Sequence, residues 1–292
     1  MFVATLVASA SMGQGDIAAA RDRLNDARCA PGDLAWLEQG KAADLFFAAD
    51  PVAARAALTG LGQGIDLIVQ PVAHRQKSLL IADMDSTMIT VECIDELADY
   101  AGIKPQIAEI TERAMRGELD FAGALHERVA LLRGLDDAAI DRCRAERVVI
   151  MGGARALVRT MKARGARTLL VSGGFTRFAE PVASEIGFDH AVANVLDIDG
   201  GRLSGTVSLP IVDAARKRAE LEAAIAGGID RALTLAVGDG ANDIPMIEGA
   251  GLGVAYHAKP KTRAAAHAEI VHGDLSVLLY AQGIAPAQWI GD

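Results

Sequence analysis

Residues 79–87 read Leu79-Leu80-Ile81-Ala82-Asp83-Met84-Asp85-Ser86-Thr87, an apolar run that ends in two carboxylates. The run predicts a short buried strand, because it is continuously apolar and polar residues follow at once. Two carboxylates at the end of such a strand would be desolvated like charges, which is costly unless a cation or hydrogen bonds compensate. A single Asp in this place is often a turn former or a helix N-cap. Because ligands of open α/β sheets bind at the carboxyl ends of the strands, the pair Asp83 and Asp85 indicates a metal and a reacting group.

The chain alternates strand and helix patterns from residue 78 onward. Buried strands are predicted at 168–171, 233–237 and 252–255, and a strand nearer an edge at 191–196. Helices are predicted at 153–164, 175–186, 213–226 and 244–249. This alternation predicts an α/β fold with a doubly wound, Rossmann-type parallel sheet that carries helices on both faces. Residues 197–205 predict a β-hairpin turn on the border of that sheet.

One stretch, between about residues 92 and 152, shows no strand pattern. Amphipathic helices are predicted there at 94–100, 107–116, 121–132 and 138–146. This insertion, about 93–152, follows the strand that carries Asp83, so it should lie over the crevice at the end of that strand. It predicts a helical cap that excludes water and shapes the choice of substrate.

Residues 1–72 predict a small α+β domain of their own. Strands are predicted at 2–8, 33–38, 43–48 and 65–69, and helices at 16–27 and 51–60. The order βαββαβ is the ferredoxin-like arrangement, and by pattern it resembles the ACT-type modules that bind regulatory amino acids. No residue identifies a ligand, so a packing or dimerisation module is an equal alternative. The polar residues 71–77 predict a linker to the second domain, 78–292.

Length and composition predict a soluble protein with a sizeable core. The chain has 292 residues, of which 51% are hydrophobic and 23% are charged. Its net charge of −9 argues against a general binder of nucleic acid or acidic membranes, which would present a basic face. Three scattered cysteines form neither a disulfide framework nor a metal spacing, so a reducing compartment is expected. No apolar run is long enough for a membrane span, and the N-terminus lacks the basic start of a signal peptide, so we expect a cytoplasmic protein.

Three further motifs in the second half carry polar side chains to the ends of predicted strands or the starts of helices. Ser172-Gly173-Gly174 offers a hydroxyl and backbone N–H groups to an oxyanion, although it is also common turn chemistry. Lys217 belongs to a basic run on a helix, which by itself is typical of a solvated face. In Gly238-Asp239-Gly240-Ala241-Asn242-Asp243, a buried strand ends in one carboxylate, and a second lies in the first turn of the next helix. Their oxygen atoms suit a hard cation such as Mg²⁺.

Taken in order, these motifs around Asp83, Ser172, Lys217 and Asp239 resemble the four motifs of the haloacid-dehalogenase-like phosphatases, over about residues 78–292. More closely, Glu92, Arg128 and the stretches 238–246 and 255–260 resemble the bacterial phosphoserine phosphatases. The resemblance implies an Mg²⁺-dependent phosphatase that hydrolyses O-phospho-L-serine to L-serine and phosphate through an aspartyl-phosphate. This reaction is the last step of serine biosynthesis.

The same resemblance implies a role for each site residue. Asp83 is the expected nucleophile, and Asp85 is the expected general acid and base. Mg²⁺ is expected to bind Asp83, the backbone carbonyl of Asp85 and Asp239. Asp243 is not an expected ligand and would orient the metal's waters or Lys217. The phosphoryl oxygens are expected to contact Ser172, the Gly173 N–H, Lys217 and, as an additional polar contact, Asn242.

Substrate choice is expected to lie with the cap. Glu92 resembles the acid that binds the ammonium group of phosphoserine, and Arg128 resembles the base that binds its carboxylate in a bidentate way. Met115 and Phe121 resemble the apolar wall of the pocket. Without the resemblance, Glu92 would be explained as an acid at a helix start and Arg128 as a surface cation.

Other functions stay open on the sequence. The chain could be a related phosphatase or phosphotransferase for another small phosphate monoester. It could be a phospho-accepting signalling module, although Asp85 and the cap argue against this. It could also be an amino-acid sensor that acts through residues 1–72. A homodimer through residues 1–72 is expected from the habit of the family.

Overall fold

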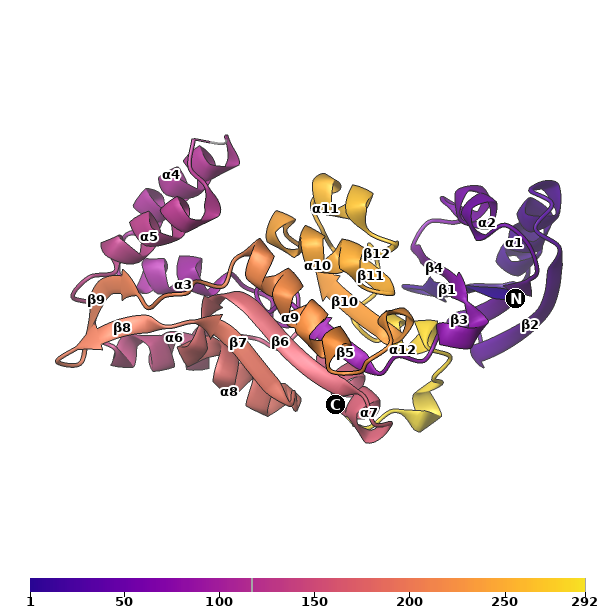
Figure 1. Cartoon of the computed structure of the whole chain (residues 1–292). Helices are drawn as coiled ribbons and strands as arrows, with labels where there is room; N and C mark the ends of the chain where they lie inside the picture. The colour runs from indigo at the N-terminus through magenta and orange to yellow at the C-terminus, as the bar shows by residue number, and fades with distance from the viewer. Residues whose placement is uncertain (117, 292) are drawn as a thin grey trace.

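The computed structural model describes residues 1–116 and 118–291, and of Met115 the backbone alone (Figure 1). Its N-terminal part contains β1 (Phe2–Ala8), α1 (Gln14–Asp26), β2 (Pro31–Glu38), β3 (Ala42–Phe47), α2 (Pro51–Leu58) and β4 (Ile65–Pro71). These strands are antiparallel in the order β2-β3-β1-β4, which is the ferredoxin-like order. Ile17, Ala20 and Leu24 recur at helical spacing on α1 and are buried. They pack with Leu6 and Leu45 of the strands in one hydrophobic core.

The part of the chain after residue 78 contains a six-stranded parallel arrangement, in the order β12-β11-β10-β5-β6-β7. Its strands are β5 (Leu79–Ala82), β6 (Arg167–Phe175), β7 (His190–Asn194), β10 (Thr234–Gly238), β11 (Leu252–Tyr256) and β12 (Ala268–Ile270). Its helices are α7 (Ala154–Ala163), α8 (Thr176–Ile186), α9 (Ala214–Ala226), α10 (Ile244–Gly249), α11 (Pro260–Ala265) and α12 (Val277–Ala281). Leu80 and Ala82 of β5 pack in one core with residues of α7, α8 and α12, whereas Leu79 and Ile81 pack in another with residues of α9 and α10. The predicted doubly wound sheet is confirmed, with β7 at its edge.

The insertion after β5 is helical, as predicted. It contains α3 (Cys93–Tyr100), α4 (Lys104–Met115), α5 (Phe121–Leu131) and α6 (Ala138–Arg147). Figure 1 shows α4 and α5 projecting at the end of the molecule away from the N-terminal strands. The hairpin of β8 (Leu196–Asp199) and β9 (Arg202–Val207) supports this cap, because Leu203 exchanges backbone hydrogen bonds with Gly134 and Leu135. Among the described residues, no helix combines the length and the apolar character needed to cross a membrane.

The strands of residues 1–72 and those of the parallel part form one ten-stranded sheet, a continuity that the sequence does not predict. β4 pairs antiparallel with β12 through Leu67 and Glu269. Beside this contact, the carboxylate of Asp66 accepts the backbone N–H groups of residues 271–273 at distances of 2.7 to 3.4 Å. The side chain of Asp66 therefore ties the end of β12 to β4 where the ladder itself is short.

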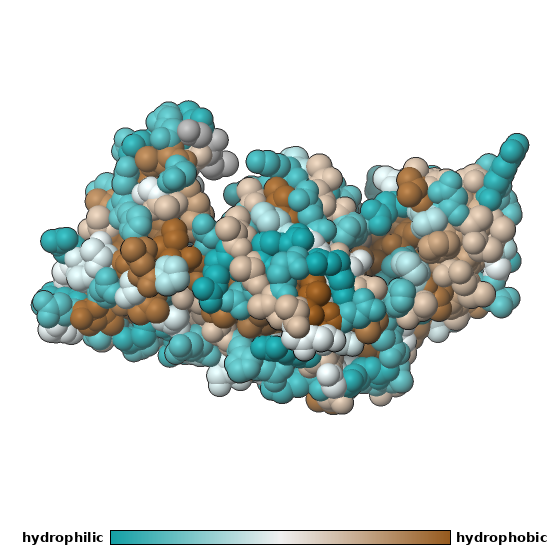
Figure 2. Space-filling model, viewed as in Figure 1, coloured by the Kyte–Doolittle hydropathy of each residue, from teal (hydrophilic) through white to brown (hydrophobic). Residues whose placement is uncertain are grey.

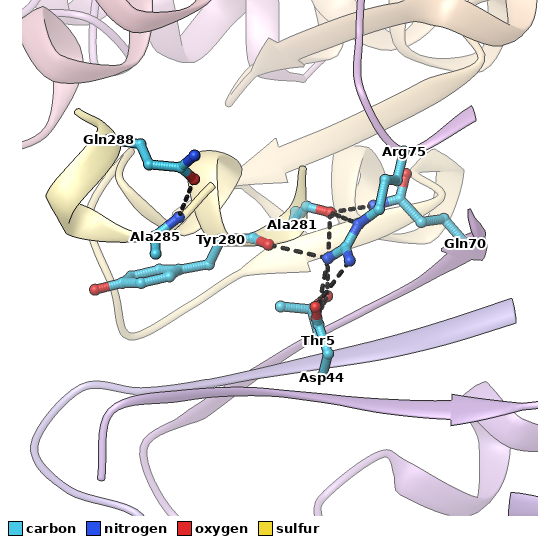
Figure 3. A network of polar contacts seen from close by, with 8 residues as sticks. All are labelled: Thr5, Asp44, Gln70, Arg75, Tyr280, Ala281, Ala285 and Gln288. Carbon is cyan, nitrogen blue, oxygen red and sulfur yellow. Dashed lines mark hydrogen bonds and ion pairs between the residues drawn. The ribbon is translucent and has the colours of Figure 1, made fainter. Parts of the chain in front are cut away.

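The predicted linker, residues 71–77, is an anchored segment rather than a free tether. Its middle forms a 3-10 turn, Val72–His74, and Lys77 is buried with its backbone N–H donating to Gln282 at 3.1 Å. Figure 3 shows the guanidinium of Arg75 between Asp44 of β3 and the carbonyl of Ala281 at the end of α12. Arg75 donates to the two carboxylate oxygens of Asp44 at 2.8 and 3.0 Å and to the carbonyl oxygen of Ala281 at 3.3 Å. One side chain thus links elements from both ends of the chain.

Replacing Arg75 with alanine is expected to lower the free energy of unfolding by about 3–5 kcal/mol, because Asp44 would stay buried without its cation. The side chain of Asp44 is 2% exposed and that of Arg75 is 13% exposed, so the contact is shielded from solvent. Urea denaturation measures the loss, and Arg164→Ala, at an exposed arginine after α7, is the matched control. The double variant Arg75→Ala, Asp44→Asn should recover part of the loss. A single variant as stable as its control would contradict the expectation.

Candidate active site

The candidate site lies at the carboxyl ends of β5 and β10, which are parallel neighbours in the sheet. Asp83 follows β5 directly, and its backbone N–H donates to the carbonyl of Val237 on β10 at 3.0 Å. Asp239 follows β10 directly, and Asp243 ends the 3-10 turn Ala241–Asp243 that comes next. Asp83, Asp239 and Asp243 each offer one carboxylate oxygen within 4.8 Å of the others. The parallel register thus gathers three carboxylates that the sequence holds in two distant motifs.

Lys217 of α9 bridges two of these carboxylates. Its Nζ lies 2.5 Å from Oδ1 of Asp83 and 2.6 Å from Oδ1 of Asp243, and the side chain is fully buried. Burial by itself would lower the pKa of Lys217, but the charges of Asp243 and Asp83 outweigh it and hold the pKa above its ordinary value. The neighbouring Arg216 and Arg218 pair instead with glutamates on the exposed face of the helix. Lys217 therefore differs from the rest of its basic run by pointing inward.

The three clustered carboxylates outnumber the one lysine that contacts them. Burial raises the pKa of Asp83, and the nearby charge of Asp243 raises it further, although Lys217 opposes both. Burial, with the charges of Asp243 and Glu92, raises the pKa of Asp239 to about 7. Lys217 contacts two of the three carboxylates, Asp83 and Asp243, so the negative charge of the group is incompletely neutralised. A hard cation with oxygen ligands would relieve this repulsion.

Asp85 has different surroundings from Asp83. Its Oδ1 accepts the backbone N–H of Cys93 at the start of α3, at 3.2 Å. Burial raises the pKa of Asp85 to about 7, and the charge of Glu92 contributes in the same direction. A Cβ atom on Gly174 would lie 2.9 Å from Oδ2 of Asp85, so a larger residue there would displace this carboxylate. Asp85 is thus a carboxyl group that can hold or release a proton near neutral pH.

The Ser172-Gly173-Gly174 turn lies within β6, next to β5. The hydroxyl of Ser172 is buried and accepts the backbone N–H of Gly174 at 2.9 Å, so it does not face the open part of the site. Gly173 does face it, and a Cβ atom there would lie 3.1 Å from the ring of Phe121. The carbonyl of Gly173 accepts from Asn194 at 2.8 Å, which fixes the turn. The glycine therefore permits a close approach of the cap to the sheet.

A cleft of about 370 Å³ lies between the sheet and the cap. In Figure 2 the opening lies between the projecting α4–α5 part and the body of the molecule. Predicted site residues that line the cleft are Asp83, Asp85, Glu92, Phe121, Arg128, Gly173, Asp239 and Asn242. Asp243, Lys217 and Ser172 lie behind its surface, and the side chain of Met115 lies outside the described residues.

The two charged cap residues are held differently. Glu92 accepts the hydroxyl of Ser86 at 2.6 Å, which fixes its carboxylate beside the sheet motif. Arg128 donates from Nε to the carbonyl of Ala124 one turn back, at 3.2 Å. Among the described residues its guanidinium forms no ion pair. Burial lowers the pKa of Arg128, although Asp95 and Glu92 oppose this. A half-buried guanidinium in the cleft is thus available to an anion.

Sequence reasoning missed several residues of the cleft. Lys259 reaches the cleft from the segment after β11, and its backbone N–H donates to the carbonyl of Asp239 at 3.4 Å. Asp95 and Thr111 line the cleft from α3 and α4. In the sequence, residues 255–260 support only the resemblance to a family. A single lysine before a proline, such as Lys259, does not by itself indicate a binding residue. Two acids at the start of α3 read as helix-start residues, so pattern alone could not single out Asp95.

Comparisons with known proteins show which family the chain resembles. A family model described as haloacid dehalogenase-like hydrolase matches residues 80–248. A phosphoserine phosphatase from Streptomyces coelicolor is 46% identical over 225 residues, which cover 77% of this chain and 55% of the relative. The chain matches little more than half the length of this relative and of two others from Archaeoglobus fulgidus and Mycobacterium tuberculosis.

Solved structures resemble the whole chain, including its N-terminal part. A hydrolase of the same superfamily from Salmonella enterica serovar Typhi has a TM-score of 0.85 at 29% identity, covering 96% of this chain and 98% of its own. A probable phosphoserine phosphatase from Vibrio cholerae has a TM-score of 0.76 at 32% identity, covering 97% of this chain and 88% of its own. The similarity therefore extends beyond the residues that line the cleft.

Proposed function

The chain belongs to the haloacid dehalogenase-like hydrolases, and on that premise we propose that it hydrolyses O-phospho-L-serine to L-serine and phosphate. The observation that carries the proposal is a cleft with two kinds of groups facing each other. Asp83, Asp85 and Asp239 line its sheet side, while Arg128 lines its cap side and Glu92 lies at the start of the cap. Phosphoserine carries an ammonium and a carboxylate, which would find opposite charges in Glu92 and Arg128, and a phosphate, which would need a cation held by the carboxylates of the sheet side. The curated relatives named phosphoserine phosphatase support the same substrate.

Mg²⁺ fits the donor set of the sheet side. The side chains of Asp83 and Asp239, with the backbone carbonyl of Asp85, would hold it, because all three supply oxygen ligands. Burial and the charge of Asp243 raise the pKa of both Asp83 and Asp239, which supports this assignment because a cation would offset that repulsion. When bound, the metal would neutralise charge on the phosphoryl group. Asp243, which contacts Lys217, would hold that lysine in position.

The chain's own residues account for the covalent steps. Lys217 contacts Oδ1 of Asp83, which leaves Oδ2 for attack on phosphorus. That attack forms the aspartyl-phosphate and breaks the bond between phosphorus and the serine oxygen, and Asp85 gives its proton to the leaving oxygen. Asp85 is then ionised and takes a proton from water as the water attacks the same phosphorus, which releases phosphate from Asp83. The pKa of about 7 suits Asp85 for both directions of transfer.

The backbone around the site contributes to phosphate binding. Gly173 faces the cleft from its turn in β6, and its N–H is the proposed donor to a phosphoryl oxygen. Asn242 lies close by, because its side-chain nitrogen would be 3.7 Å from a Cβ atom on Gly173. Ser172 acts through the turn, since its hydroxyl accepts from Gly174. Phe121 covers this turn from the cap and would exclude water from the bound phosphate.

Replacing Arg128 with alanine tests the assignment of the substrate. We expect KM for O-phospho-L-serine to rise about 10-fold to 100-fold, because a hydrogen-bonded charge pair with the substrate carboxylate contributes about 1.5–3 kcal/mol. KM for p-nitrophenyl phosphate, which has no carboxylate, should change little. Steady-state kinetics on both substrates provide the comparison, with Arg142→Ala on an exposed position of α6 as the control.

The outcomes separate three cases. A selective loss on phosphoserine supports the proposal. An equal loss on both substrates would remove Arg128 as the carboxylate partner. No activity of the unaltered protein on phosphoserine, with activity on other phosphate monoesters, would overturn the substrate and keep the class of reaction.

Removal of divalent metal is expected to stop turnover. Dialysis against EDTA should reduce phosphate release at least 100-fold, and added Mg²⁺ should restore it, since phosphoryl transfer depends on neutralising the phosphate charge. The same treatment should leave the secondary structure unchanged, because Lys217 still bridges Asp83 and Asp243 without the metal. Circular dichroism checks the second point. Full activity of a protein that mass spectrometry shows to be metal-free would contradict the assignment.

A further inference from the structure

A second and larger cavity, of about 600 Å³, lies where the two halves of the sheet meet. One wall comes from the end of α2 and residues 59–62 after it, and the other from α11 and the residues before β12. Figure 2 shows a hollow between these two parts of the molecule, with hydrophobic residues at its floor. The volume falls within the range of about 300–1,000 Å³ that is usual for small-molecule sites. None of its lining residues belongs to the catalytic cleft.

The floor and walls of this junction cavity are partly apolar. Leu67 contributes from β4, Leu61 from the residues after α2 and Ala264 from α11, while Leu6 and Leu58 lie beneath them with almost no exposed surface. Such a surface favours a ligand with a body of several carbon atoms, because burying that body removes apolar area from water. It does not favour a bare inorganic ion.

Most charged groups of the junction cavity already have partners. Arg263 pairs with Glu269 across the wall formed by α11 and β12. Asp66 is 3% exposed, and its two oxygens accept the backbone N–H groups of residues 271–273. These groups need no ligand to satisfy them.

Arg55 and His267 are the exceptions. Arg55 on α2 is partly buried, and its guanidinium has no hydrogen-bond or ion-pair partner among the described residues. Nδ1 of His267 accepts the backbone N–H of Gly253 at 2.8 Å, so a neutral ring carries its proton on Nε2 and can donate from there. The charge of Arg55 acts on this ring and, after burial, helps to lower the pKa of His267. One cation and one neutral donor thus line the same cavity without partners.

We infer that the junction cavity is a binding site for a small organic anion, with one carboxylate or phosphate group on an apolar body. Arg55 holds the anionic group by a charge-assisted hydrogen bond, and His267 donates a second one. The apolar body packs on Leu61, Leu67 and Ala264. Because the ligand contacts both walls, it stabilises the junction of β4 with β12. This site is separate from the proposed active site and does not depend on the substrate of that site.

Isothermal titration of the full chain with two probes tests the inference. Hexanoate supplies a carboxylate with an apolar chain, and butylphosphonate supplies a phosphate-like group that the active site cannot hydrolyse. We expect saturable binding of at least one probe, and which one binds identifies the class of anion. Arg55→Gln should weaken this binding at least 10-fold, Arg55→Lys should weaken it less, and Arg164→Gln should leave it unchanged. The neutral 1-hexanol should bind at least 10-fold more weakly than the preferred anion.

Thermal unfolding gives an independent readout, because a ligand that binds the folded chain raises the melting temperature. The preferred probe should raise it for the unaltered protein and for Arg164→Gln, and much less for Arg55→Gln. All variants should keep their phosphatase activity, since Arg55 and Arg164 lie outside the catalytic cleft. The inference is overturned if neither anion binds, if 1-hexanol binds equally well, or if Arg55→Gln binds like the unaltered protein. The last result would point to binding in the catalytic cleft instead.

Discussion

Asp83→Asn is expected to lower turnover of O-phospho-L-serine by about 10⁴-fold or more, because an amide oxygen cannot serve as the attacking carboxylate. No phosphoenzyme should accumulate when the reaction with labelled substrate is stopped with acid. The stability of the metal-free protein should stay equal or rise. Burial and the charge of Asp243 raise the pKa of Asp83, so its ionised form is less favourable in the folded than in the unfolded chain at neutral pH. Phosphate release and acid-stable label measure activity, and thermal unfolding measures stability.

The control for this variant is Asp22→Asn, at an exposed position on α1. It should leave turnover, labelling and melting temperature unchanged. A labelled Asp83→Asn protein would show that another residue accepts the phosphoryl group. A large loss of stability in Asp83→Asn would mean that the loss of activity reports unfolding instead of chemistry.

Lys217→Met is expected to lower the free energy of unfolding by about 3–5 kcal/mol and to abolish turnover. Methionine preserves much of the side-chain volume but leaves Asp83 and Asp243 as buried like charges without the shared cation. Asp239 adds a third carboxylate within reach of both. Urea denaturation in the presence of EDTA isolates the effect of the lysine from that of a metal.

A second substitution separates charge from packing. Adding Asp243→Asn to Lys217→Met should restore part of the stability, because it removes one of the two buried carboxylates that lost their cation. Lys261→Met, at an exposed lysine of α11, is the matched control and should be neutral. If Lys217→Met unfolds like its control, the ion pairs carry no net stability and the role of Lys217 is confined to catalysis.

The sheet and its carboxylates were predictable because each depends on a local pattern. The run 79–82 is short and wholly apolar, and both of its faces are buried in the structure. Asp83 and Asp239 follow their strands directly, so parallel neighbours bring them together without any knowledge of long-range contacts. Lys217 was different, since only the resemblance selected it from the basic run, and the pattern favoured an exposed position. Its burial depends on α9 packing against the sheet, which a local pattern does not contain.

The features that sequence reasoning missed depend on single long-range contacts. β12 has three residues, too few for a strand pattern, and it exists by pairing with β11 and β4. Arg75 stands in a polar segment that predicts a linker, and its partner Asp44 lies on a strand of the other half. The junction cavity also depends on the tertiary structure, because Arg55 and His267 line it from parts of the chain that are far apart in sequence. Such features follow from the tertiary arrangement and not from periodicity.

The single pairing of β4 with β12 also decides what a shortened chain would expose. Without residues 1–72, β12 would become the outer strand of the sheet, and its backbone groups on one side would have no partner. The N–H groups of residues 271–273 would lose the carboxylate that now accepts them. Open strand edges recruit other chains, so the isolated catalytic half would tend to aggregate or exchange strands. Residues 1–72 therefore cover the edge of β12, and we expect them to prevent the sheet from pairing with a strand of another chain.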